Sequence, residues 1–167
     1  MTKLKCIILL LFFNCFMAVG QDAIRINHLP FIQGLTEQSV SIIWTTDKPA
    51  TGWVELAPDD SSHFYFKERP KYYAAVYGFK KVGTLHQVTL NNLKPGTRYR
   101  YRVYSQEVLK HVGVNVQYGK VVASDVYQKA PLFFQTFGHA SSTHFTVVND
   151  IHERNEVLDK LLDIGNL

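Results

Sequence analysis

Apolar side chains recur at every second position in several stretches of this chain, and that period predicts β-strands. Val40, Ile42 and Trp44 show it first, as in a strand that buries one face. The next residues, Thr46–Pro49, are polar and end in a proline, which predicts a turn. Because residues 51–57 resume the β pattern, we expect the two runs to pair as antiparallel neighbours.

The clearest alternation is found in residues 98–103. Three arginines alternate there with Tyr99, Tyr101 and Val103. A strand places the two sets on opposite faces, whereas a helix would mix them. We expect the apolar set to face a core and the arginines to face solvent. Further strands are predicted at 72–79, 84–90 and 132–137.

Aromatic residues gather in and just after a polar loop at 58–71. Such a cluster could bind a sugar or a partner, but packing in the core or against the loop is the use we expect. Trp44 and Trp53 are expected in the core or at its edge. The clustered aromatics are Phe64, Tyr65, Phe66, Tyr72 and Tyr73.

The pattern changes after residue 137. Residues 138–143 are small and polar and predict a linker. Residues 144–149 then form an apolar, β-branched run typical of a strand buried on both faces of a parallel sheet. Residues 155–164 carry an apolar stripe at helical spacing. The segment 144–167 therefore predicts the opening strand and helix of an α/β layer.

Asp150 and His152 follow directly after that apolar run. Residues two apart in extended backbone project to the same side, and ligands of open α/β sheets bind where strands end. A carboxylate beside an imidazole suits Fe, Mn or Zn. These two residues are the candidate metal ligands. His139 and His144 lie nearby, but we expect them to be surface residues of the linker.

The first twenty residues indicate export. Lys3 and Lys5 precede the apolar stretch Cys6–Val19, and Ala18-Val19-Gly20 places small residues before Gln21, so residues 1–20 predict a cleaved signal peptide. The stretch is shorter than the ~20 apolar residues of a membrane span. A lipoprotein signal that uses Cys15 stays open as an alternative.

Cleavage would remove both cysteines, so the exported chain would fold without disulfides. A hydrophobic fraction of 46% with 19% charged residues predicts a folded chain, and a net charge of +4 is too small to indicate nucleic-acid binding. These properties fit a bacterial periplasmic, cell-surface or extracellular protein.

The run Leu93–Val103 resembles the fibronectin type III signature around its sixth strand, in which a Leu-x-Pro-Gly-Thr-x-Tyr motif ends in a corner tyrosine, here Tyr99. A second resemblance covers residues 22–137 and is carried by Leu29–Leu35, Ser39–Trp44, Asp47–Ala50 and Trp53–Glu55. These stretches look like the N-terminal domain of secreted enzymes of the purple acid phosphatase type. The resemblance implies a mostly β fold, a fibronectin-III-like β-sandwich.

Residues 144–167 resemble the first metal motif of calcineurin-like metallophosphoesterases. The resemblance implies that Asp150 and His152 bind the first of two metal ions and that the complete enzyme hydrolyses phosphate esters. The family's further ligand motifs do not occur in this sequence, so we expect this chain alone to be inactive. An alternative interpretation is a stand-alone extracellular binding or adhesion module. The substrate and the oligomeric state do not follow from the sequence.

Overall fold

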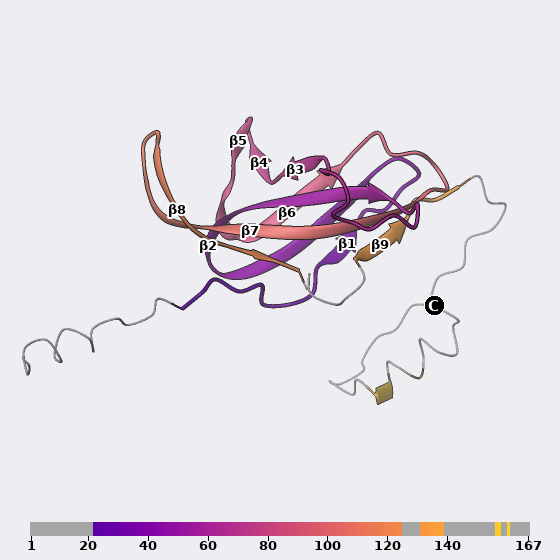
Figure 1. Ribbon diagram of the computed structural model, residues 1–167, viewed down its shortest axis with the longest axis horizontal. Helices are drawn as coiled ribbons and strands as arrows, with labels where there is room; N and C mark the ends of the chain where they lie inside the picture. Colours follow the sequence, from indigo (N-terminus) through magenta and orange to yellow (C-terminus); the bar gives the residue numbers. More distant parts are fainter. Residues whose placement is uncertain (1–21, 125–130, 139–155, 158–159, 161–167) are drawn as a thin grey trace, which may run out of the picture. The chain divides into compact units, whose positions relative to one another are not determined.

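The computed structural model describes residues 22–124, 131–138, 156–157 and 160. The chain divides into two compact units, Met1–Phe137 and Gly138–Leu167. The described part of the first unit consists of β-strands joined by turns and loops (Figure 1). In the second unit, the described residues Glu156, Val157 and Lys160 are α-helical. The strand predicted at 144–149 lies outside the described residues, as does the linker predicted at 138–143 except for its first residue.

The long strand β2 (Val40–Pro58) organises the sandwich. Its first half pairs with β1 (Phe31–Gln33) and β6 (Val82–Leu90). Its second half pairs with β3 (Lys71–Tyr73) and β7 (Arg98–Val112). Apolar side chains from both sets of strands meet in one cluster, so the two halves of β2 belong to opposite walls of a single core.

The turn predicted at Thr46–Pro49 is wrong. The chain stays extended there, and Asp47 donates its backbone N–H to the carbonyl of Arg25 at 3.1 Å, so the N-terminal segment supplies partners for this stretch. The pairing with β6 shifts its register between Thr45 and Ala50. Pro49, which has no N–H to donate, lies within this irregularity. The chain therefore passes from one wall of the sandwich to the other instead of folding back on itself.

The strand predicted at 72–79 is interrupted. β3 ends at Tyr73, and β4 (Ala75–Val76) forms a small separate hairpin with β5 (Phe79–Lys80). The turn between them has positive φ at Tyr77 and Gly78. Two positive φ values give the turn the twist that a tight hairpin needs.

Sequence patterning missed β8 (Asn115–Ala123), which pairs with the second half of β7. Gly113 and Val114 connect the two strands, and Gly113 has φ +58°. A glycine at the first of two loop positions favours a hairpin. The last strand, β9 (Leu132–Gln135), pairs with the first residues of β7 and confirms the β-structure predicted at 132–135.

The predicted corner tyrosine is confirmed. The hydroxyl oxygen of Tyr99 accepts a hydrogen bond from the backbone N–H of Lys94 at 2.9 Å. Gly96 turns the chain with φ +60° between these two residues, and its N–H binds the carbonyl of Phe137 at 2.9 Å. The bond thus fixes the approach of the chain to β7, as in immunoglobulin-like sandwiches.

The core contains a polar row beside its apolar residues. Trp44 is fully buried, as predicted, and its indole N–H donates to the Ser105 hydroxyl at 2.9 Å. The buried His86 stacks on Trp44 with ring centroids 5.2 Å apart, and its Nε2 lies 3.0 Å from the Thr46 hydroxyl. Since that hydroxyl also donates to the Lys48 carbonyl, His86 Nε2–H is the donor of the pair. Burial lowers the pKa of His86 to about 4, so its ring is neutral at pH 7.

Candidate functional site

The two predicted metal ligands, Asp150 and His152, lie outside the described residues, as do His139 and His144. Their geometry therefore stays a prediction. In the part of the chain that the structure does describe, no group of three or more His, Cys, Asp or Glu side chains could hold a metal ion.

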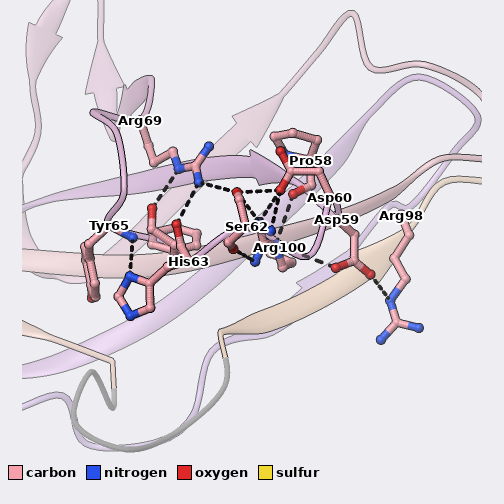
Figure 2. A network of polar contacts seen from close by, with 10 residues as sticks. Pro58, Asp59, Asp60, Ser62, His63, Tyr65, Arg69, Arg98 and Arg100 are labelled. Atoms are coloured by element: carbon pink, nitrogen blue, oxygen red, sulfur yellow. Dashed lines mark hydrogen bonds and ion pairs between the residues drawn. The ribbon is translucent and has the colours of Figure 1, made fainter.

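A network of polar contacts surrounds the loop that follows β2 (Figure 2). The loop begins where Asp60 accepts hydrogen bonds from the backbone N–H and the hydroxyl of Ser62, at 3.1 and 2.6 Å. Ser61, between them, has φ 60°, a conformation that such a tight turn requires. The Ser62 hydroxyl and N–H, followed by the Arg100 guanidinium, hold the pKa of Asp60 below its usual value.

Arg100 fastens this turn to the sheet. Its Nε donates to the Pro58 carbonyl at 3.0 Å, one terminal nitrogen donates to the Ser62 carbonyl at 2.6 Å, and the other contacts the Asp60 carboxylate at 2.7 Å. Only 12% of the Arg100 side chain is exposed. All three guanidinium nitrogens are thus engaged within the loop, and this arrangement favours a structural role over anion binding.

Arg69 closes the same loop from its other end. Its Nε donates to the Phe64 carbonyl at 2.7 Å, and a terminal nitrogen donates to the Ser62 hydroxyl and the His63 carbonyl, both at 3.2 Å. The two guanidinium groups of Arg69 and Arg100 therefore meet at Ser62, as Figure 2 shows.

The prediction that the arginines of β7 face solvent is wrong for two of the three. Arg98 is half exposed and pairs with Asp59 at 3.0 Å. Arg100 is mostly covered, and Arg102 is 4% exposed, with its guanidinium 5.5 Å from the ring centre of Phe64 and 3.1 Å from the Ser124 carbonyl. The alternation of faces is correct. The loop of residues 59–70 covers the arginine face. Alternation in the sequence shows which residues share a face of the strand, but not whether a loop covers that face.

The clustered aromatics divide between two environments. Phe64 is buried beneath the loop, as predicted. The others are exposed on the outer side, and Phe66 is 83% exposed, so packing alone does not account for them. The exposed members are Tyr65, Phe66, Tyr72 and Tyr73.

The sequence of the sandwich identifies its family. Residues 27–129 match the family model described as purple acid phosphatase, N-terminal domain, and this span is more than half of the chain. The chain belongs to that family. Membership confirms the resemblance of residues 22–137 to the N-terminal domain of purple-acid-phosphatase-like enzymes and marks the chain as a phosphatase-related protein. The matched span ends before the metallophosphoesterase segment predicted at 144–167.

Solved structures give a looser likeness. A fibronectin type III domain from the human KIAA0970 protein is 14% identical, with a TM-score of 0.37, over 72% of this chain and 82% of that one. The sensor domain of the anti-sigma factor RsgI4 of Pseudobacteroides cellulosolvens is 16% identical, with a TM-score of 0.34, over 72% of this chain and 99% of that one. No functional conclusion follows at these values. No sequence among the curated proteins matches the chain.

Within the described residues, no helix is both long enough and apolar enough to span a membrane.

Proposed function

We propose that this chain is the N-terminal part of an exported, metal-dependent phosphoesterase, with the sandwich as an accessory domain. The family match over residues 27–129 carries the proposal, because it relates the sandwich to purple acid phosphatases. The Asp150-x-His152 pair supports it, since it follows an apolar run and precedes a helical stripe, as a metal loop of an α/β sheet would.

Export belongs to the same proposal. The basic residues Lys3 and Lys5, the apolar stretch Cys6–Val19 and the small residues before Gln21 have the order of a signal peptide. The mature chain would carry no cysteine, and its stability would come from the core of the sandwich.

The donor types of Asp150 and His152 suit Fe, Mn or Zn, but two donors make only part of a site. Catalytic zinc is held by about three protein ligands. When bound, such metals would activate water for attack on a phosphate ester. We expect residues 21–167 alone not to hydrolyse p-nitrophenyl phosphate with Mn²⁺ or Zn²⁺. Turnover by this chain would contradict the interpretation that Asp150 and His152 make only part of a metal site.

The coding sequence downstream of Leu167 provides the test. A Gly-Asp-x-x-x-Asp or Gly-Asn-His-Asp/Glu run there, in any frame, would supply the missing metal motifs, whereas unrelated sequence would favour the stand-alone module. In a chain extended through those motifs, we expect phosphatase activity that Asp150→Asn and His152→Ala each reduce at least 100-fold. Glu153→Gln is the matched control, because it changes a neighbouring polar residue that the resemblance does not assign to the metal. Full activity of Asp150→Asn would overturn the proposal.

A further inference from the structure

A row of aromatic side chains crosses the outer face of the sheet opposite the core. Trp53 of β2 lies opposite Tyr73 of β3 on one side and Tyr104 of β7 on the other. The rings of Trp53 and Tyr104 are nearly parallel, with centroids 5.2 Å apart, and the centroid of Tyr73 is 5.8 Å from that of Trp53. We call Tyr73, Trp53 and Tyr104 the aromatic row.

Trp53 and Tyr104 stack face to face and therefore turn ring edges toward their surroundings. Ring edges carry the positive part of the aromatic quadrupole and therefore favour negative groups. The Tyr104 hydroxyl extends the row by donating to the Tyr65 hydroxyl at 3.3 Å. Burial and the Tyr65 hydroxyl raise the pKa of Tyr104, so the Tyr104 hydroxyl stays protonated at neutral pH.

Lysines surround the aromatic row. Residues 63–81 contain four lysines and, besides Arg69, one other charged residue, Glu68. Lys80 lies over the ring of Tyr73, with its Nζ 4.1 Å from the ring centre, and Lys71 is exposed on β3. Arg69 is engaged in the loop, and the four lysines outnumber the carboxylates Glu55 and Glu68, so the surface keeps a net positive charge that complements an anionic partner.

The β4–β5 hairpin adds aromatic rings with accessible faces. Tyr77 at its turn is 97% exposed, and Phe79 is 78% exposed. Tyr77 also holds φ 49°, a left-handed conformation that costs a bulky residue about 1–2 kcal/mol. A large apolar side chain that is kept exposed in an unfavourable conformation indicates a contact outside the domain.

We propose that the aromatic row and the β4–β5 hairpin bind an acidic polysaccharide. Its acid groups would meet Lys71, Lys80 and the tyrosine hydroxyls, and its sugar rings would lie on Tyr77 and Phe79. The Glu55 carboxylate, 3.5 Å from the Trp53 indole nitrogen, can accept hydrogen bonds from the hydroxyl groups of a glycan, whereas the backbone of DNA has no hydroxyl group to donate. This carboxylate favours a glycan over a nucleic acid. The proposal is independent of the phosphoesterase function.

Tryptophan fluorescence of the full chain, titrated with polygalacturonate, tests the proposal. Trp44 is buried in the core, so a change in emission reports on the partly exposed Trp53. We expect a saturable change that weakens with added salt, is absent with neutral dextran, and disappears in Trp53→Phe. Absence of a saturable change with polygalacturonate would overturn the proposal.

Variants locate the site, with affinity electrophoresis in polygalacturonate gels as the readout. We expect Tyr77→Ser and Lys80→Glu, both at exposed positions, to weaken binding at least tenfold. Leu85→Ala, at an exposed apolar position on β6, and Lys94→Glu are the matched controls and should bind as the parent chain does. Equal losses in the controls would contradict the assignment of the site. Tighter binding of an oligodeoxythymidylate than of polygalacturonate would overturn the proposal of a glycan ligand and would indicate a nucleic acid instead.

Discussion

At the scale of single residues, Gly52 shows how closely the core is packed. A Cβ atom on Gly52 would lie 2.6 Å from a ring carbon of Trp44 and 2.8 Å from Nδ1 of His86. Both rings are buried, and Trp44 is held by its bond to Ser105, so neither can move aside easily. The requirement for glycine here comes from the two stacked rings across the core.

We therefore expect Gly52→Ala to lower the free energy of unfolding by about 1–3 kcal/mol, the usual cost of an overpacked core. Urea unfolding monitored by circular dichroism would measure it. Gly83→Ala on β6 is the control, because a Cβ atom there meets nothing within 4 Å. A stability of Gly52→Ala equal to that of the control would contradict the packing argument.

His86 makes the stability of the sandwich depend on pH. Its folded-state pKa is about 4, against an ordinary value of 6.5 for the unfolded chain, so the unfolded state binds the proton more readily. The contribution of the neutral His86 ring to the free energy of unfolding is therefore fully present above pH 6.5. It is lost as the pH falls toward 4, by up to about 1.4 kcal/mol per pH unit. Asp47 and Asp60, whose pKa values are lowered below 3.8, add losses only at still lower pH.

Unfolding curves between pH 7 and 4.5 would measure this loss. We expect His86→Gln to be less stable than the parent chain at pH 7 but to depend less steeply on pH in that window, because the titrating ring is gone. His111→Gln, at an exposed position on β7, should keep the parent's slope. An unchanged slope in His86→Gln would show that other groups cause the pH dependence.

At the scale of elements, the loop after β2 depends on one side chain from another strand. Arg100 bonds to three residues of the turn, whereas Arg98 gives the loop one half-exposed ion pair with Asp59 and otherwise lies over the ring of Phe133 on β9. Hydrogen bonds to charged groups contribute about 1.5–3 kcal/mol, and exposed ion pairs about 0–1 kcal/mol. Removal of Arg100 should therefore destabilise the loop more than removal of Arg98, although the two arginines are only two residues apart on β7.

We expect Arg100→Met to loosen the loop around Lys67, which is already exposed, so that a lysine-specific protease cleaves after Lys67 at least tenfold faster than in the parent chain. Arg98→Met should leave that rate within about twofold, since it removes only a weak surface pair from the loop, and its contact with Phe133 lies on β9. Mass spectrometry of the first fragments would identify the cleavage. Equal rates for the two variants would refute the role of Arg100 as the anchor.

Sequence patterning predicts elements well where the period is undisturbed and poorly where partners decide the conformation. The alternation at residues 98–103 gave the correct faces, and the motif ending in Tyr99 gave the correct corner. The turn predicted at Thr46–Pro49 failed, because Arg25 and its neighbours, distant in sequence, keep that stretch extended. Strand β8 was missed, although Gly113 between alternating valines is a hairpin signal.

At the scale of the whole molecule, the predictions for the sandwich and for the segment after it rest on different evidence. The fold of the sandwich could be predicted because its core residues and its family motif lie in the same stretch of sequence. The candidate metal pair, Asp150 and His152, could be named from its position after an apolar run. Its geometry could not be predicted, since a metal site depends on ligands that separate motifs bring together. The aromatic row was likewise beyond sequence reasoning, because its three members come from three strands.

The packing of the sandwich makes a last prediction about its boundary. The apolar cluster of the described residues extends along the chain from Val40 to Phe134, and the Phe137 backbone bonds to Gly96 and Thr36. A chain that ends at Gly138 keeps all of these contacts, so we expect its melting temperature to match that of the full chain within about 2 °C. A chain that ends at Pro131 loses β9 and the buried Phe134, which packs on Tyr99 and should cost about 3–5 kcal/mol. Calorimetry of the two shortened chains would separate the cases, and a marked loss on ending at Gly138 would mean that the later residues contribute to the stability of the sandwich.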